Sequence, residues 1–233
     1  MLTDDSNYVL GALKLGRSLQ THTTTPIDRV FIELSSRLLP IEDRERLRIA
    51  GWKRCTVKRI APLDEKGTFG RFKDQFSKLH VWAMIVYKTV LYLDSDTIAV
   101  KSVDHLLQLN LSGKHIGAAH DFGEGSWRPT FNMGVFVIHP NMSEYNRLVA
   151  MQRDPSIKFE TAMCEQGFLN VIYSDAWEDI GFVNNANLAI YSQDQAYWNA
   201  NEHLINIIHY TMNKPWNCGD EYAAPCELWK AWS

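Results

Sequence analysis

The stretch Val90–Thr97 reads VLYLDSDT and decides the fold. In it, a run of apolar and β-branched residues ends abruptly at two aspartates, Asp94 and Asp96. A run of this length and composition is typical of a buried strand in a parallel sheet. Open α/β sheets bind their ligands at the carboxyl ends of their strands, so the stretch predicts a binding site there. Residues i and i+2 of a strand point to the same side, and two neighbouring carboxylates at a strand end favour a divalent cation.

Strands and helices alternate along the rest of the chain, which predicts an α/β fold with a mixed, mostly parallel central sheet flanked by helices. Besides the strand at Val90, we expect strands at residues 29–34, 55–60, 115–120, 131–139 and 204–210. Helices are expected just after Ser6, from Pro40, and at residues 77–87, 102–109, 143–152 and 165–174. The first helix follows the start of the sequence so closely that almost no room is left for a strand before it.

The 233 residues suit one domain over 1–233, because a core of that size needs no disulfide or structural metal. We expect residues 1 to about 100 to bind a nucleotide and the remainder, about 101–233, to hold the second substrate. The net charge of −3 argues against nucleic acid as a partner, and no apolar stretch is as long as a membrane span. The four cysteines lack metal-ligand spacing and read as buried thiols, although Cys218 and Cys226 could pair in an oxidising compartment.

His209 is a third candidate ligand, because it ends the apolar run Leu204–Ile208 as a strand terminus would. Carboxylates select hard cations such as Mg²⁺, and an added imidazole shifts the preference toward Mn²⁺. Lys214 follows shortly afterwards in the sequence KPW, where an ammonium group would neutralise charge on a leaving diphosphate. The alternative for the aspartates is structural, with Asp96 capping the turn or helix that follows.

A series of ordered blocks resembles the retaining family 8 glycosyltransferases, a group that includes glycogenin and galactinol synthase. The blocks are LTDDSNYVLGALKLGRSL, SKLHVW, LDSDT, FNMGVFV, EQGFLN and HYTMNKPW. They run in the family's order from Leu2 to Trp216, so the resemblance covers nearly the whole chain. It implies the Rossmann-like GT-A fold, a UDP-sugar donor and bound Mn²⁺, with Mg²⁺ as the alternative ion.

Carried over residue by residue, the resemblance implies a metal site, a nucleotide pocket and a sugar pocket. The metal ligands would be Asp94, Asp96 and His209, with Asp94 also touching the ribose. The nucleotide, the diphosphate and the near side of the sugar would contact Leu2, Thr3, Tyr8, Lys78, Ser95 and Lys214. The donor sugar and its reacting carbon would lie beside Asp121, Asn132, Gln166 and Glu165, the last standing where the family usually has an aspartate.

Several of these residues also have a structural interpretation. Tyr8 at helical spacing suits a core aromatic, Asn132 suits a turn cap, and Glu165 at a helix start is favoured by the helix dipole. Trp216 reads as packing that fixes the lysine loop. Tyr191 falls close to the tyrosine that glycogenin glucosylates on itself, and we interpret it as a core or loop tyrosine.

The predicted reaction is metal-dependent transfer of a hexose from a UDP-sugar to an acceptor hydroxyl, with retention at the anomeric carbon. Lys214 would stabilise the leaving UDP. Gln166 is a poor nucleophile, which favours a front-face route and leaves Glu165 as the fallback nucleophile. The sequence leaves open whether the acceptor is a glycan, polyol, lipid or protein, whether the protein forms a homodimer, and whether it lies in the cytoplasm or the Golgi lumen.

Two alternatives belong to other functional classes. The sequence DSDT also resembles the nucleophile motif of haloacid-dehalogenase-type phosphatases, in which Asp94 would be phosphorylated and Asp96 would be the acid/base. That motif normally lies near the N-terminus with an acidic pair downstream, and here only Glu178 and Asp179 could serve. The second alternative is a non-catalytic sugar-nucleotide-binding module, against which the intact set of candidate ligands argues.

Overall fold

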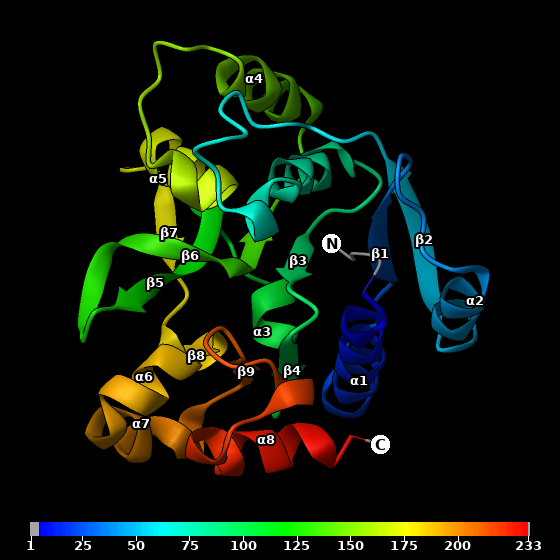
Figure 1. Cartoon of the computed structure of the whole chain (residues 1–233), viewed down its shortest axis with the longest axis vertical. Helices are drawn as coiled ribbons and strands as arrows, with labels where there is room; N and C mark the ends of the chain where they lie inside the picture. The colour runs from blue at the N-terminus through cyan, green and yellow to red at the C-terminus, as the bar shows by residue number, and fades with distance from the viewer. Residues whose placement is uncertain (1–4, 233) are drawn as a thin grey trace.

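The strand predicted at Val90 is the edge strand of a four-stranded sheet. The structure is a computed structural model that describes residues 5–232, apart from the side chain of Arg71. The order of the strands is β3 (Val90–Leu93), β6 (Ser126–Ile138), β5 (Ile116–Gly123) and β7 (Trp177–Asp179) (Figure 1). The turn after β3 carries both aspartates of the motif and leads into β4 (Thr97–Ala99).

Two smaller sheets accompany the central one. The strands β1 (Arg29–Leu34) and β2 (Trp52–Val57) pair in parallel, and β9 (Ile207–His209) pairs with β4 and with β8 (Ala186–Asn187). The mixed α/β fold is confirmed, but β6 is antiparallel to both of its neighbours. The alternation of strands and helices predicted a mostly parallel sheet. It missed much of the antiparallel pairing, because β5 and β6 form a hairpin. The hairpin turns at Glu124 and Gly125, whose positive φ angles of 54° and 72° suit the twist of paired strands.

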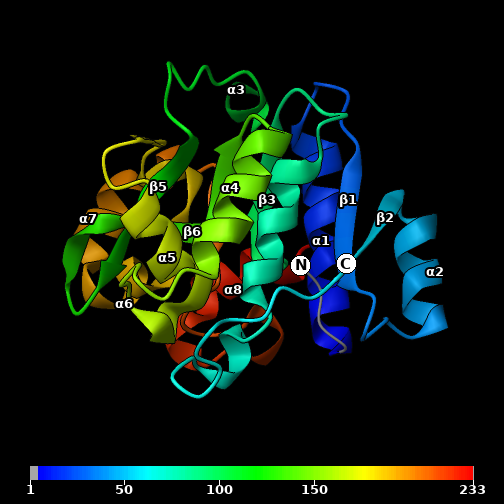
Figure 2. The same cartoon turned by 90° about the horizontal axis from the view of Figure 1, so that it is seen from above.

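Helices cover both faces of the central sheet, because the side chains of β6 alternate between them. Val135 and Val137 pack against α1 (Ser6–His22) and α3 (Asp104–Leu107). Phe136 and Ile138 pack against α4 (Met142–Gln152) and α5 (Cys164–Ile172), which lie on the same side of the sheet (Figure 2). Burial on both sides explains why this part of β6 is almost continuously apolar.

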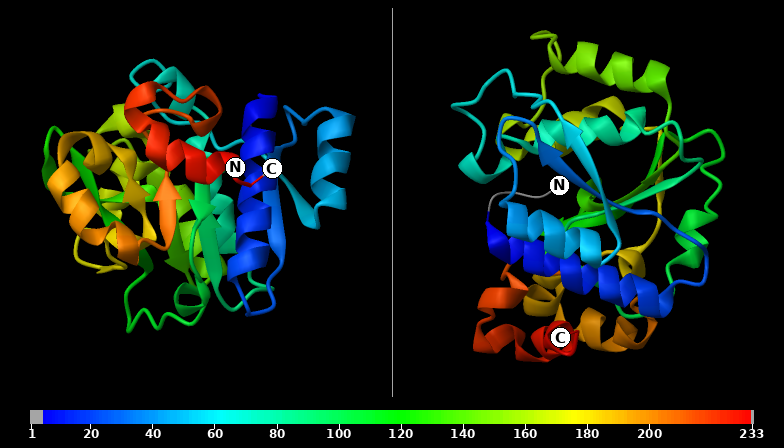
Figure 3. Two further views of the ribbon diagram at one scale, coloured as in Figure 1. Left: turned by 90° about the horizontal axis from the view of Figure 1, so that it is seen from below. Right: turned by 90° about the vertical axis from the view of Figure 1, so that its right-hand side faces the viewer.

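Helix α1 begins where the sequence predicted, because the Asp5 side chain caps it and accepts a hydrogen bond from the Asn7 N–H at 2.9 Å. The helix packs beside α2 (Ile41–Ile49), as the right-hand view of Figure 3 shows. At Gly11 its backbone comes very close to the β3–β4 turn. A Cβ built on Gly11 would lie 2.2 Å from the Ser95 carbonyl oxygen, so any side chain there would push α1 away from the turn.

The C-terminal part of the chain packs around the sheet of β4, β9 and β8. A cluster that includes Ile208 and Tyr210 lies among α6 (Leu188–Gln193), α7 (Gln195–Asn201) and α8 (Ala223–Lys230). Cys218 and Cys226 form a disulfide here, the pairing expected for oxidising conditions. None of the helices between residues 5 and 232 is long and apolar enough to cross a membrane.

Short 3₁₀ helices connect these elements, and two of the predicted boundaries differ from those of the structure. Their bounds are Gly70–Phe72, Gln75–Ala83, Thr161–Met163, Phe182–Asn184, Glu202–Leu204, Pro215–Asn217 and Asp220–Tyr222. The second of them, η2, replaces the helix predicted at 77–87, because Phe76, Leu79 and Trp82 are buried at a three-residue period. The strand predicted at 55–60 begins earlier, since the positive φ of Gly51 (84°) turns the chain directly into β2.

One seam of the fold lacks backbone pairing. Among the described residues, β1 pairs only with β2, and β3 only with β6. The two strands line one cavity of about 380 Å³, with Val30, Ile32, Leu91 and Leu93 in its wall. Packing of side chains such as Ile32 and Tyr92, rather than a hydrogen-bond ladder, therefore holds the β1–β2 pair beside the central sheet.

Substitution of Gly11 by alanine tests the close approach of α1 to the β3–β4 turn. Alanine is favoured over glycine inside a helix by about 1 kcal/mol, so propensity alone would stabilise the protein. We expect instead a loss of about 1–3 kcal/mol in unfolding free energy, because the added Cβ would overlap the Ser95 carbonyl oxygen.

Urea denaturation measures this difference. Gly70→Ala is the control, because a Cβ built at Gly70 meets no heavy atom within 4 Å. A Gly11→Ala protein that is at least as stable as the wild type would show that α1 is not held against the turn.

Candidate active site

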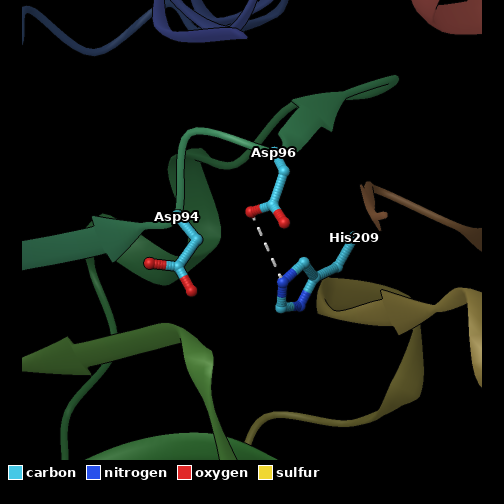
Figure 4. Close-up of side chains that lie close together, drawn as sticks. All are labelled: Asp94, Asp96 and His209. Carbon is cyan, nitrogen blue, oxygen red and sulfur yellow. Dashed lines mark ion pairs between the residues drawn. The ribbon is translucent and has the colours of Figure 1, made fainter. Parts of the chain in front are cut away.

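Asp94, Asp96 and His209 lie together, although His209 is far from the aspartates in the sequence. The strand β9 is antiparallel to β4 with His209 opposite Thr97, and the Tyr210 N–H donates to the Asp96 carbonyl at 2.9 Å. One ligand atom from each of the three side chains lies within 4.8 Å of the other two. Figure 4 shows these side chains pointing toward a common space.

The His209 ring is buried, and its two nitrogens face different partners. Only 4% of this residue is exposed; its Nδ1 lies 2.9 Å from Oδ1 of Asn185 and its Nε2 lies 3.7 Å from Oδ1 of Asp96. Burial lowers the pKa of His209 below its usual value, although the carboxylates of Asp96 and Asp94 act in the opposite direction. The ring is therefore neutral at neutral pH, which is the form that binds metal ions.

Gly134 of β6 leaves the space that the imidazole occupies. A Cβ built on Gly134 would lie 1.9 Å from Cε1 of His209. The carbonyl of the same glycine accepts a hydrogen bond from the Asp94 N–H at 2.8 Å. One residue of β6 thus sets the position of a carboxylate ligand and of the imidazole.

Lys78 of η2 forms a buried bridge between two acids. Its Nζ lies 3.3 Å from Oδ1 of Asp94 and 3.0 Å from Oε1 of Glu165, at the start of α5. Burial would lower the pKa of Lys78, but the two carboxylates outweigh it and raise that pKa. Burial would likewise raise the pKa of Asp94, but the charge of Lys78 holds it below its usual value. Burial does raise the pKa of Glu165, with Lys78 opposing it.

Lys214 approaches the metal ligands from the other side. Its ammonium group forms an ion pair with Asp96 and donates to the Tyr210 carbonyl at 3.3 Å. Burial would lower the pKa of Lys214, but the Asp96 carboxylate outweighs it and raises that pKa. The Tyr8 ring of α1 meets the Trp216 ring edge to face, with 4.9 Å between centroids. The first helix and the KPW segment therefore lie on the same side of the site.

Asp121, Asn132 and Gln166, the residues predicted for the sugar pocket, come together from β5, β6 and α5. Oδ1 of Asp121 accepts a hydrogen bond from Nδ2 of Asn132 at 3.1 Å, and its Oδ2 accepts one from Nε2 of Gln166 at 3.0 Å. The Met133 N–H donates to Oε1 of Gln166 at 3.0 Å. A carboxylate and two amides thus form one hydrogen-bonded group, which Asn185 links to the candidate ligand His209.

Four other sequence candidates have different positions. Leu2 and Thr3 lie outside the described residues. Ser95 is buried against α1 and borders the cavity between β1 and β3. Tyr191 packs edge to face on Trp198 in the C-terminal part, in agreement with its interpretation as a packing residue.

Two residues that touch the candidate ligands were missed from the sequence. Tyr92 donates its hydroxyl hydrogen to Oδ1 of Asp94 at 2.9 Å. The alternation of β3 could have found it, because residues two apart in a strand point the same way. Asn185, which contacts His209, lies between the 3₁₀ helix Phe182–Asn184 and β8. No sequence motif or periodic pattern distinguishes it from the other asparagines.

The donor set fits a divalent cation. An ion bound at about 2.1–2.4 Å holds opposite ligands about 4.2–4.8 Å apart. The three side chains already have this span, within 4.8 Å. Carboxylate oxygens and a neutral imidazole nitrogen are both common ligands of divalent cations in proteins.

The family model described as glycosyl transferase family 8 matches residues 1–219. The chain is a member of glycosyl transferase family 8. The ordered blocks of the sequence predicted this family, and the fold and the clustered ligands agree with it.

Curated relatives of the family 8 chain are longer than it is. Glycogenin-1 from *Oryctolagus cuniculus* is 28% identical over 228 residues, which cover 93% of the family 8 chain and 64% of the relative. UDP-glucuronate:xylan alpha-glucuronosyltransferase 2 from *Arabidopsis thaliana* is 27% identical over 239 residues, which cover 95% of the family 8 chain and 36% of the relative. The family 8 chain thus spans less than two thirds of either relative.

A solved structure shares the fold. The glycosyltransferase GlyE from *Streptococcus pneumoniae* TIGR4 aligns with a TM-score of 0.67 at 22% identity, covering 97% of the family 8 chain and 57% of GlyE. This likeness confirms the predicted GT-A fold.

Replacement of Lys78 by methionine tests the buried bridge. The variant keeps an unbranched side chain but leaves the Glu165 carboxylate, which is 3% exposed, without its cation. We expect a loss of about 3–5 kcal/mol in unfolding free energy, measured by urea denaturation. The double variant Lys78→Met/Glu165→Gln should recover much of it, and Lys88→Met on the exposed surface is the control.

The loss in Lys78→Met should also depend on pH. Without the lysine, burial raises the pKa of Glu165 still further above its unfolded value. The carboxyl group then favours folding below the unfolded pKa, and this contribution is lost as the pH rises through the folded pKa. The defect should therefore be larger at pH 8 than at pH 5, and an equal defect at both would contradict the bridge.

Proposed function

We propose that the protein transfers a hexose from a UDP-sugar to an acceptor hydroxyl in a divalent-cation-dependent reaction that retains the anomeric configuration. The convergence of Asp94, Asp96 and His209 beside the ammonium group of Lys214 carries this proposal. Family membership supports the glycosyltransferase class. The UDP-glucuronate in the name of the *Arabidopsis thaliana* relative supports a UDP-sugar as donor.

Asp94, Asp96 and His209 would hold Mn²⁺, or alternatively Mg²⁺. The bound cation would supply positive charge to the diphosphate of the donor. Lys214 already faces a negative group, the Asp96 carboxylate, and its charged ammonium would stabilise the charge that develops on the departing UDP. Tyr8 packs against Trp216, which follows Lys214 in the KPW segment. Tyr8 would contact the nucleotide, and it belongs to the half of the chain, up to about residue 100, that would bind it.

Asp121, Asn132 and Gln166 would hold the donor sugar through its hydroxyl groups, because together they offer both acceptors and donors of hydrogen bonds. The Gln166 amide is a poor nucleophile, so the leaving phosphate would take the proton of the acceptor hydroxyl on the same face of the sugar. Glu165 is engaged with Lys78, which supports a positioning part for it in this route.

The phosphatase alternative needs a second acidic pair near Asp94 and Asp96. The metal-ligand cluster found among the described residues contains His209 and neither Glu178 nor Asp179, which lie in β7 at the opposite edge of the central sheet. This arrangement favours glycosyl transfer.

A panel of UDP-sugars tests the proposal directly. Release of UDP is measured from UDP-glucose, UDP-galactose, UDP-N-acetylglucosamine, UDP-xylose and UDP-glucuronate, with Mn²⁺, with Mg²⁺ and with a chelator. We expect turnover of at least one donor that depends on the cation. Cation-independent turnover would remove the metal from the proposal, and binding without turnover of any donor would favour the sugar-nucleotide-binding module.

Asp96→Asn tests the metal assignment on the preferred donor. The amide keeps the shape of the side chain but loses the charge shared by the cation and Lys214. We expect transfer to fall by about 100-fold or more, with an unchanged circular dichroism spectrum. Asp175→Asn at an exposed position is the matched control and should keep full activity. Unchanged activity of Asp96→Asn would exclude Asp96 as a ligand.

A further inference from the structure

Side-chain amides connect the predicted sugar pocket to the imidazole of His209. Asn132 donates from Nδ2 to Oδ1 of Asp121, and Asn185 donates from Nδ2 to Oδ1 of Asn132, each at 3.1 Å. Oδ1 of Asn185 lies 2.9 Å from Nδ1 of His209. An unbroken row of hydrogen bonds therefore runs from Asp121 to a candidate metal ligand.

The orientation of the first amide follows from a backbone group. The Gly134 N–H lies 2.9 Å from the Asn132 side chain, and a backbone N–H can only donate, so the atom facing it must be the amide oxygen. The amino group of Asn132 then faces Asp121, whose carboxylate can only accept while it is ionised. Both neighbours demand the same orientation, so it does not depend on how the amide was assigned.

The orientation of the second amide follows from the first. Because Asn132 presents its oxygen, the atom of Asn185 that meets it must be the amino nitrogen, and the oxygen of Asn185 must face His209. An amide oxygen only accepts, so Nδ1 of His209 has to carry the hydrogen. In a neutral imidazole, Nε2 then carries a lone pair, and it is Nε2 that lies 3.7 Å from Oδ1 of Asp96.

Without a hydrogen-bond acceptor at Nδ1, His209 would favour the tautomer that carries its hydrogen on Nε2. The Asp96 carboxylate lies on the Nε2 side, with the Asp94 carboxylate in the same cluster, and these charges favour a hydrogen on that nitrogen. An Nε2–H cannot bind a cation, so the nearest charges oppose the form that a metal ligand needs. The hydrogen bond on Nδ1 has to outweigh them.

We propose that Asn185 is the positioning residue that holds His209 in the Nδ1-protonated tautomer and so keeps Nε2 available to a divalent cation. The inference rests on the proposed function in naming a cation as the ligand, whereas the tautomer is a property of the protein alone. Partners of this kind on the second nitrogen of a metal-binding histidine typically change metal affinity by about 10–100-fold when they are removed.

The chain offers a matched control in the adjacent residue. Asn184 is 5% exposed and Asn185 is 3% exposed, so both are buried amides of the same segment. Asn184 contacts a different histidine, because its Oδ1 lies 2.9 Å from Nε2 of His105. Asn184→Ala therefore removes an equally buried amide without touching His209.

The experiment compares the wild type, Asn185→Ala and Asn184→Ala, each with ¹⁵N-labelled histidine and free of metal. Long-range ¹H–¹⁵N spectra report which ring nitrogen carries hydrogen, and His209→Gln assigns the signals. We expect His209 to be protonated on Nδ1 in the wild type and in Asn184→Ala, and to shift toward Nε2 in Asn185→Ala. Titration with Mn²⁺ alone, followed by electron paramagnetic resonance of the free ion, should show a Kd raised about 10–100-fold in Asn185→Ala only.

A wild-type His209 protonated on Nε2 would overturn the inference, and this measurement does not depend on whether any variant folds. An Asn185→Ala protein with unchanged tautomer and unchanged Mn²⁺ affinity would overturn it as well. Equal effects of Asn184→Ala and Asn185→Ala would also overturn it, because they would reflect general loosening of the segment. Failure of the proposed function is a separate outcome, since a protein that turns over no UDP-sugar can still show the expected tautomers.

Discussion

The absence of a side chain at residue 134 is the constraint on which the site depends. The imidazole of His209 fills the place that a side chain on β6 would take, with Cε1 1.9 Å from the position of a Cβ. Because β6 pairs with β3 and β5 while His209 belongs to β9, this contact joins the C-terminal sheet to the central one. The carbonyl of the same glycine holds the backbone of Asp94. Strand packing thus brings the candidate metal ligands together.

The charges around these ligands are arranged so that each acid has a partner within the protein. Lys78 bridges Glu165 and Asp94, and Lys214 pairs with Asp96. A buried carboxylate without a partner costs several kcal/mol, so the two lysines make the accumulation of acids compatible with folding. The same ammonium groups are therefore already fixed by the protein, so binding of the proposed donor diphosphate would need little reorganisation.

The sequence predicted those parts of the fold and site that rest on short, regular patterns. The capping residue and apolar spacing located α1, and the end of an apolar run located Asp94 and Asp96 beside His209. The hairpin of β5 and β6 and the 3₁₀ geometry of η2 were missed, because hydrophobic alternation does not report strand direction or small changes in helical period. The role of Asn185 could not be predicted either, because it depends on a contact with His209 that exists only in the folded protein.

The seam between β1 and β3 is held by side-chain packing without a hydrogen-bond ladder. Among the described residues no ladder crosses it, so β1, β2 and α2 can separate locally at a lower free energy than global unfolding requires. Amides along the two free edges should then exchange with solvent faster than those of β6, which is paired on both sides. The half of the chain proposed to bind the nucleotide contains this unit, so local separation there would set an upper limit on how rigidly that side of the pocket can be held.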